Sequence, residues 1–446
     1  MILSLLLACS GEPATPPSTQ PQATQAEAPR TVVLVIGCTL RRDRIGAYGN
    51  PREGVSPYLD ALASQGALFE EMRSNAPWTR PSIGSLTTGR YPLVLGIDDP
   101  GPGMNTTRGV HPDFETVAEA FQRGGYTTIG ATANPNANGT FGMDQGFDTY
   151  HELARLWREE QSKIPGDEVV ESVLESAKEV DGDLYLQLVL IDTHAPLSQE
   201  AVVPRHFGLD VMRSPTKLDQ YDAAVRIFSE AVEELDQGLQ KMGRGDRTLV
   251  IVGDHGEGLH HPKHAAKAHG RFLYDANVGT PWIVHGPGIP AARVQGLATN
   301  IDVKPTLLDL GGVEPVAQVD GRSRAGLLRE GLTDTEEQSA FVETYYSRDH
   351  RRRWITPEWS LIENIATKSK PVPVDRGEVE LYAHDDVQQD HDLSEANAEV
   401  VAELSGQMAE LRKELLRQQR IWDSEALGDD LNAQLEALGY VDPAKQ

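Results

Sequence analysis

Short apolar runs alternate along this chain with segments of helical periodicity, and this alternation restricts its fold more than any other feature. The apolar runs are rich in β-branched and aliphatic residues and fall at 31–37, 126–133, 184–191, 248–252 and 281–285. Amphipathic segments lie between them at 57–64, 115–123, 168–179 and 223–242. Repeated strand–helix units of this kind build a mostly parallel sheet sandwiched by helices. The sequence therefore predicts an α/β domain over residues 31–325.

A smaller C-terminal α+β subdomain is predicted for residues 326–446. Segments 340–346, 353–362 and 379–383 have the composition of short antiparallel strands. Segment 396–420 has the apolar spacing of a helix that packs on the body. Two packed units suit the chain length of 446 residues, because a single core stops growing at roughly 250–300 residues.

The N-terminus predicts a targeting segment rather than part of the fold. Residues 1–9 form a short apolar stretch that ends in Ala8 and Cys9, similar to a bacterial lipoprotein signal with an acylated cysteine. Residues 10–30 are rich in Pro, Thr, Gln and Ala and predict a disordered linker. We expect a cell-envelope lipoprotein at the outer membrane, facing the periplasm or the cell surface. The absence of a basic residue before the apolar stretch leaves an ordinary apolar N-terminus as the alternative.

Composition excludes several classes of partner. The chain has 67 acidic and 41 basic residues and a formal net charge of −26, which disfavours nucleic acid and other polyanions. An anionic substrate then needs a local counter-charge, such as a metal ion. No apolar run approaches the ~20 residues of a membrane span, so membrane contact is expected only through the N-terminal anchor. With Cys9 acylated, Cys38 has no partner, and no disulfide is expected.

Polar side chains follow three of the predicted strands directly. Cys38 and Thr39 follow the first, Asp192-Thr193-His194 follow the third, and Asp254-His255 follow the fourth. Ligand sites of open α/β sheets lie beyond the carboxyl ends of the strands. A single Asp or His at such a place is more often a turn residue, but three together indicate a metal or catalytic site.

A nucleophile candidate lies in the segment Trp78-Thr79-Arg80-Pro81-Ser82. Pro81 suits the first turn of a helix, so Thr79 is predicted at or next to its N-cap. Backbone N–H groups and the helix dipole favour negative charge there. When the segment is considered by itself, the alternative interpretation is that Thr79 is an ordinary helix N-cap residue with no chemical role.

From Thr31 to Val441 the chain resembles the sulfatase-like branch of the alkaline phosphatase superfamily. The matching segments occur in the family's order at 31–43, 45–49, 56–63, 81–82 with 85–92, 141–148, 254–257, 269–275, 284–288, 302–309, 380–382 and 438–441. The resemblance implies the alkaline-phosphatase-like fold and ester hydrolysis at the strand carboxyl ends.

The resemblance also implies a metal site, from which this chain departs at one position. The family holds its ion with an aspartate after the first strand, an Asp and a His or Asn after a later strand, and the nucleophile oxygen. Asp254, His255 and Thr79 match, but Cys38 replaces the first aspartate. We expect one divalent ion, with zinc favoured over calcium, magnesium or manganese, because a thiolate suits zinc. In the alternative, Cys38 is a small buried residue and the site is degenerate.

The nucleophile position departs from the family as well. Sulfatases have a cysteine or serine there that is oxidised to formylglycine, which Thr79 cannot become, and Ile83 replaces the arginine of their motif. Threonine nucleophiles are found in the superfamily's phosphoethanolamine transferases, lipoteichoic acid synthases and phosphonoacetate hydrolases. The resemblance gives His194 the role of protonating the leaving group or contacting the transferring group, and places His269 toward the same group.

We therefore expect a metal-dependent hydrolase or transferase that uses Thr79 on phosphate, phosphonate or, less favourably, sulfate esters of a small molecule, glycan or lipid. Two alternatives remain. One is a catalytically degenerate surface lipoprotein that binds a partner, and the other is a sulfatase that works by a different route.

Overall fold

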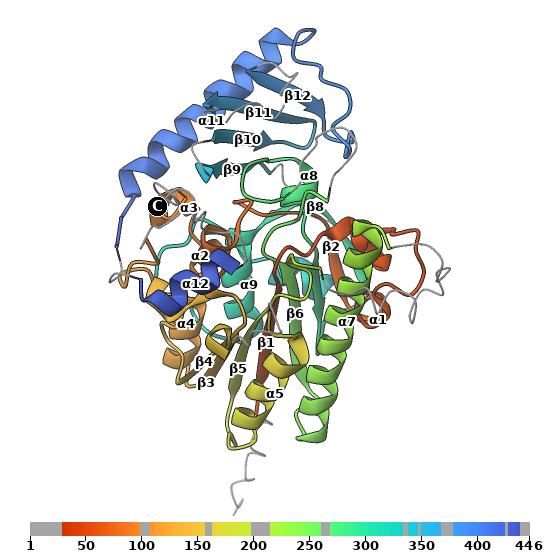
Figure 1. The fold of residues 1–446 in the computed structure, drawn as a ribbon, viewed down its shortest axis with the longest axis vertical. Helices are drawn as coiled ribbons and strands as arrows, with labels where there is room; N and C mark the ends of the chain where they lie inside the picture. The colour runs from red at the N-terminus through yellow and green to blue at the C-terminus, as the bar shows by residue number, and fades with distance from the viewer. Residues whose placement is uncertain are drawn as a thin grey trace, which may run out of the picture.

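The protein is described by a computed structural model over residues 29–98, 108–156, 163–197, 215–259, 268–332, 338–346, 349–366, 378–423 and 427–437. Within these residues, strands form an eight-stranded central sheet and a separate four-stranded sheet (Figure 1). This architecture confirms the predicted fold class. No helix in the described ranges is both long enough and apolar enough to cross a membrane.

The central sheet has the strand order β4-β3-β5-β1-β6-β7-β2-β8. Its strands are β1 (Thr31–Gly37), β2 (Ala67–Arg73), β3 (Thr127–Thr132), β4 (Thr149–Glu152), β5 (Leu184–Leu190), β6 (Arg247–Gly253), β7 (Trp282–His285) and β8 (Ala292–Thr299). The four predicted runs at β1, β3, β5 and β6 form neighbouring parallel strands. The predicted run at 281–285 differs, because β7 pairs antiparallel with both β6 and β2.

The antiparallel direction of β7 agrees with the position of the chain just before it. Helix α8 (Asp275–Val278) lies just before β7, and the Val278 carbonyl accepts a hydrogen bond from the Ser74 N–H, one residue beyond the end of β2. The chain is thus already at the carboxyl edge of β6 when β7 begins. From that edge, β7 runs back between β6 and β2 and pairs antiparallel with both.

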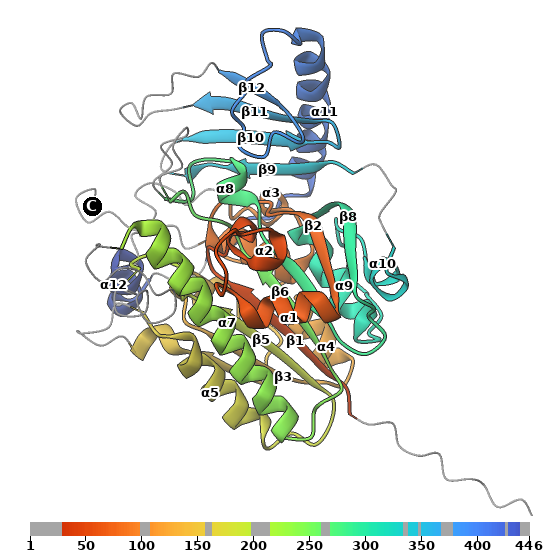
Figure 2. The same ribbon diagram turned by 90° about the vertical axis from the view of Figure 1, so that its right-hand side faces the viewer.

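Helices cover both faces of the central sheet (Figure 2). On one face, α1 (Pro57–Gln65), α5 (Gly166–Ala177) and α7 (Lys217–Lys241) pack on Val33 and Val35. On the other, α2 (Thr79–Thr88), α4 (Val117–Arg123) and α9 (Val303–Leu310) pack on Val32, Leu34 and Ile36. Successive side chains of a strand point to opposite faces, so one apolar run supplies both cores. The remaining helices of the main body are α3 (Pro92–Leu95) and α10 (Ala325–Glu330).

The second sheet is antiparallel and lies beside the carboxyl-end edge of the central sheet (Figure 1). Its order is β12-β11-β10-β9, with β9 (Ala340–Thr344), β10 (His350–Ile355), β11 (Trp359–Ala366) and β12 (Val379–Ala383). Helix α11 (Ala398–Gln418) packs on it, and α12 (Asp429–Ala437) returns to the main body. The predicted strand at 353–362 is instead a hairpin, because the turn at 356–358 contains Pro357 and divides it into β10 and β11.

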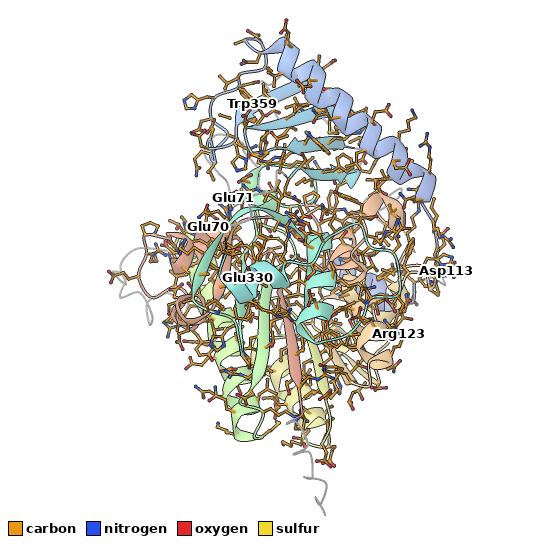
Figure 3. The ribbon with its side chains drawn as sticks, turned by 180° about the vertical axis from the view of Figure 1, so that it is seen from behind. Glu70, Glu71, Asp113, Arg123, Glu330 and Trp359 are labelled. Atoms are coloured by element: carbon orange, nitrogen blue, oxygen red, sulfur yellow. The ribbon has the colours of Figure 1, made fainter. Side chains whose placement is uncertain are left out.

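A buried ion-pair cluster joins the two sheets. The Asp275 carboxylate lies 2.7 Å from Arg353 of β10, 2.8 Å from Arg73 of β2 and 3.3 Å from Arg42. Burial alone would raise the pKa of Asp275, but the three guanidinium groups outweigh it and hold that pKa well below its ordinary value. Glu71, also paired with Arg73, lies at the boundary between the central body and the second sheet (Figure 3).

We predict that Asp275→Asn lowers the free energy of unfolding by about 3–5 kcal/mol, because buried guanidinium groups lose their shared counter-charge. The lowered pKa adds a pH dependence with a defined sign. The stabilisation by Asp275 is present above the unfolded-state pKa of about 3.9 and is lost as the pH falls below it. Denaturant unfolding of wild type and variant between about pH 7 and pH 2 should therefore show the difference shrinking in acid.

The matched control is Asp309→Asn, which removes an exposed ion pair with Arg329 at 3.0 Å. An exposed pair contributes little, so this change should stay within about 0.5 kcal/mol. Equal losses from the two substitutions would show that the junction cluster does not hold the sheets together.

Candidate active site

Two neighbouring strand ends bring three of the predicted metal ligands together. Cys38 follows β1, while Asp254 and His255 follow the adjacent β6. The Cys38 sulfur, an Asp254 oxygen and a His255 ring nitrogen lie within 4.8 Å of one another, and all three residues are fully buried. The structure therefore places these three predicted ligands in one group.

Thr79 lies against this group at the first residue of α2. Its Oγ1 is 3.2 Å from His255 Nε2 and 3.5 Å from Cys38 Sγ. Trp78 is extended and Pro81 occupies the first turn, as expected for a helix start that tolerates a missing N–H. The hydroxyl is thus at a helix N-terminus, where the dipole favours negative charge.

The Asp254 carboxylate is held on one side only. Its Oδ1 accepts hydrogen bonds from the backbone N–H groups of Thr39 at 2.8 Å and His255 at 2.6 Å. Thr39 has a φ of 61°, a left-handed conformation uncommon outside glycine. The other carboxylate oxygen of Asp254, Oδ2, is buried and has no hydrogen-bond partner among the described residues, a costly state for a carboxylate. Burial raises the pKa of Asp254 to about 7.

The other two ligands are also held in neutral forms by their surroundings. Burial, followed by the charge of Asp254, raises the pKa of the Cys38 thiol well above its ordinary value. Burial lowers the pKa of His255 well below its ordinary value, and His255 Nδ1 lies 2.9 Å from the Gly256 carbonyl oxygen. Nδ1 therefore carries the proton and donates it, which leaves the Nε2 lone pair facing Thr79.

These residues fit a divalent cation. The orphaned Asp254 oxygen, the Cys38 sulfur and the His255 Nε2 lone pair are an O, S and N donor set that converges on one point. A cation bound there would offset the free-energy cost that burial imposes on a charged thiolate and a charged carboxylate.

His194 and His269 form a second group beside the first. Their ring centroids lie 5.1 Å apart, and the His269 ring lies 4.7 Å from that of His255. His269 Nδ1 is 3.0 Å from Glu257 Oε2, and both side chains are buried. All three residues His194, His269 and Glu257 line a cavity of about 370 Å³ whose other walls include Leu197, Leu259 and Tyr346.

The surroundings of His194 disfavour the proton-donor role predicted for it. Burial, and then the nearby His269, lower the pKa of His194 to about 3, and its Nδ1 lies 2.5 Å from the Ala195 carbonyl oxygen. A neutral ring that donates through Nδ1 has Nε2 as an acceptor. His269 is the better-oriented candidate for the acid, because the contact of its Nδ1 with Glu257 Oε2 fixes the ring and leaves Nε2 for the ester.

Two positioning residues were not anticipated from the sequence. Lys163 Nζ donates to the carbonyl oxygens of Asp192 at 2.6 Å and His194 at 2.9 Å, and so fixes the loop after β5. Burial lowers the pKa of Lys163 to about 8. Asn134, two residues after the end of β3, donates its side-chain amide to Cys38 Sγ at 3.1 Å. Asn134 follows a predicted strand, a signal that could have identified it, whereas nothing local marks Lys163.

Several sequence-based interpretations fall outside the described residues. They concern the lipoprotein signal at 1–9, most of the linker at 10–30 and the segment 438–441. They remain predictions.

The sequence of this chain matches family models and characterised proteins. A family model described as Sulfatase matches residues 30–313, and one described as N-sulphoglucosamine sulphohydrolase, C-terminal, matches residues 267–414. The chain is 24% identical to Delta 4,5-hexuronate-2-O-sulfatase of Bacteroides thetaiotaomicron over 356 residues, or 66% of this chain and 71% of that protein. A stretch of 125 residues is 32% identical to the extracellular sulfatase SULF-1 homolog of Drosophila melanogaster, and it spans 27% of this chain and 11% of that protein.

Solved structures agree with this comparison at the level of the fold. A 2-O GAG sulfatase superposes with a TM-score of 0.68 at 18% identity, over 91% of this chain and 96% of the other. A phosphonate monoester hydrolase from Silicibacter pomeroyi superposes with a TM-score of 0.65 at 18% identity, over 86% of this chain and 95% of the other.

We predict that Asp254→Asn stabilises the metal-free protein near pH 8 by on the order of 3 kcal/mol. The folded-state pKa of about 7 exceeds the unfolded-state value of about 3.9, so folding is penalised as the pH rises through this window. Above pH 7 the penalty is complete, and near pH 4 the two proteins should have similar stability. Denaturant unfolding in the presence of a chelator measures the difference.

An added divalent cation should reverse this order, because only the wild type retains the carboxylate ligand. Asparagine can still accept the Thr39 and His255 N–H groups, so the variant should fold. A variant that is less stable than the wild type in chelator near pH 8 would contradict this account of the buried carboxylate.

Proposed function

The chain belongs to the sulfatase family, and from this membership we propose that it is a metal-dependent hydrolase or transferase that cleaves phosphate, phosphonate or sulfate esters through Thr79. One observation carries the proposal: Thr79 Oγ1 lies 3.2 Å from His255 Nε2 and 3.5 Å from Cys38 Sγ, in the group that also contains Asp254. A nucleophile at a helix start beside convergent ligands is what ester cleavage of this kind requires.

Cys38, Asp254, His255 and Thr79 are the residues that would hold the cation. When bound, it supplies Lewis-acid polarisation of the ester oxygen and lowers the pKa of a neighbouring hydroxyl. The donor set favours zinc over calcium, magnesium or manganese, because thiolate and imidazole ligands suit zinc.

In the reaction we propose, Thr79 would give up its hydroxyl proton to solvent, and its Oγ1 then forms a bond to phosphorus or sulfur while the bond from that atom to the leaving oxygen breaks. The leaving oxygen takes a proton from His269, which Glu257 orients through the 3.0 Å contact with Nδ1. Water or an acceptor alcohol then attacks the threonine ester, restoring the Thr79 hydroxyl and releasing the transferred group. His194 borders the same cavity and contacts the bound ester rather than donating to it.

Phosphoryl or phosphonyl transfer is favoured over sulfate transfer. The formylglycine of sulfatases is made from cysteine or serine, and Thr79 lacks the primary Cβ that this oxidation needs. A threonine oxygen can attack phosphorus without modification.

We predict that Thr79→Ala lowers kcat/KM by about 10³-fold or more, because it removes the attacking oxygen, and that Thr79→Ser retains part of the activity. The full chain should be assayed on aryl phosphate monoesters and diesters, phosphonates and sulfates with added zinc, manganese, magnesium or calcium. Thr87→Ala is the matched control, since Thr87 is a buried threonine of the same helix whose hydroxyl bonds back to the Ile83 carbonyl at 2.9 Å.

Equal turnover by the wild type and Thr79→Ala would exclude the proposed nucleophile. Absence of both turnover and metal binding in the wild type would instead favour the catalytically degenerate alternative, for which the replacement by Cys38 is the supporting observation.

We also propose that Cys9 is acylated and anchors the protein in the cell envelope, at the outer membrane. The apolar residues 1–8, the small Ala8 before the cysteine and the polar linker after it support this. Cys9→Ser should abolish incorporation of a labelled fatty acid and move the protein from the membrane fraction to the soluble fraction of its host. Unchanged labelling would exclude Cys9 as the site of acylation.

A further inference from the structure

We propose that Asn134 is a positioning residue for the metal-binding sulfur: its side-chain N–H donates to Cys38 Sγ and holds that sulfur beside Asp254 and His255, where the three side chains would bind the cation. This inference rests on the metal site of the proposed function and names a residue that the nucleophile and ligand motifs do not include. It also explains how a buried thiolate can be accommodated where the family has a carboxylate.

The contact is short and fully enclosed. Asn134 Nδ2 lies 3.1 Å from Cys38 Sγ, and both residues have no exposed surface. Asn134 comes from the end of β3, whereas Cys38 follows β1, with β5 between the two strands in the sheet. The amide therefore reaches the sulfur from two strands away in the sheet.

The turn at Asn134 fixes which end of the amide faces the sulfur. Asn134 Oδ1 accepts the backbone N–H of Asn136 at 2.9 Å, so the oxygen is already engaged. The Asn134 N–H donates to Thr132 Oγ1 at 3.0 Å, and that hydroxyl donates to the Asn134 carbonyl at 3.1 Å. With the backbone and the oxygen both held, only the NH₂ group can point at Cys38.

A neighbouring turn shows that the contact with sulfur is not needed to form the turn. Asn138 Oδ1 accepts the Thr140 N–H at 2.9 Å in the same way, four residues further on. Asn138 is equally buried, yet its Nδ2 has no hydrogen-bond partner among the described residues. The turn requires only the amide oxygen, so the N–H at Asn134 remains available to act on the sulfur.

The chemical effect of this donor depends on the charge of the sulfur. An N–H bond to a thiolate is charge-assisted and stronger than one to a neutral thiol, so it favours the metal-binding form. Removing the donor leaves a buried anion with less compensation and makes its electrons easier to transfer to the metal. Cobalt reports both effects, because it occupies zinc sites and shows a sulfur-to-metal charge-transfer band.

The experiment compares Asn134→Ser with Asn138→Ser in the full chain, titrated with Co²⁺. Serine keeps an oxygen that can accept the N–H two residues on, but it is too short to reach the sulfur. For Asn134→Ser we expect the charge-transfer band to move to lower energy and the Co²⁺ affinity to fall by 10- to 100-fold, as typical for loss of a partner of a metal ligand. Asn138→Ser should leave the band and the affinity unchanged.

The outcomes separate this inference from the proposed function. Co²⁺ binding by Asn134→Ser with an unchanged band and affinity overturns the role of Asn134 and leaves the metal site intact. Binding by the wild type without a sulfur charge-transfer band overturns the role of both Cys38 and Asn134, while Asp254, His255 and Thr79 remain as ligands. No Co²⁺ binding by the wild type overturns the metal site itself and this inference with it.

A measurement on the wild type covers the case in which Asn134→Ser does not fold. In protein loaded with ¹¹³Cd²⁺, NMR should show a coupling between the metal and a side-chain amide proton of one asparagine, transmitted through the N–H···S bond. The absence of that coupling in a protein that binds cadmium through sulfur would overturn the inference.

Discussion

The parallel pairing of β5, β1 and β6 is the constraint on which the candidate site depends. Gly37 lies opposite Leu190 on one side and opposite Gly253 on the other, so the three strands end at one level. The register continues past the strand ends, where Cys38 N–H donates to the Leu190 carbonyl at 2.8 Å and Asp254 N–H donates to the Gly37 carbonyl at 3.2 Å. A slip of one residue would turn a ligand to the opposite face of the sheet.

Helix α2 is not part of this sheet, so the position of Thr79 needs a separate explanation. The Ser82 hydroxyl, one turn along the helix, donates to the Asp254 carbonyl oxygen. The Asn300 side-chain amide donates to Ser82 Oγ at 2.7 Å and ties it to the loop after β8. The nucleophile candidate is therefore placed relative to Asp254 by hydrogen bonds from the residue three positions after it. This accounts for a serine at that position without giving it a chemical role.

The parts predictable from the sequence are those set by local patterns. Strands β1, β5 and β6 are almost purely apolar, and the residues after them were therefore identified. Strand β2 was missed because Glu71 and Arg73 interrupt its apolar pattern, and their charges are compensated only by tertiary partners such as Asp275, 202 residues after Arg73. Lys163 was missed for the same reason, since its carbonyl partners lie 29 and 31 residues further along the chain. Long-range compensation of a buried charge leaves no local signal.

Two of the departures from the sulfatase pattern, Cys38 and Thr79, are in contact with each other, and this bears on whether the site is altered or lost. Cys38 Sγ lies 3.5 Å from Thr79 Oγ1 and accepts the amide of Asn134. Independent decay would fill such positions with apolar residues, because an enclosed polar group without compensation is costly. Asp254 keeps an unpartnered buried oxygen beside them, which no packing requirement explains. A cation that binds oxygen, nitrogen and sulfur would compensate all of these groups at once, and under the proposed function the two departures would then reflect a changed metal preference.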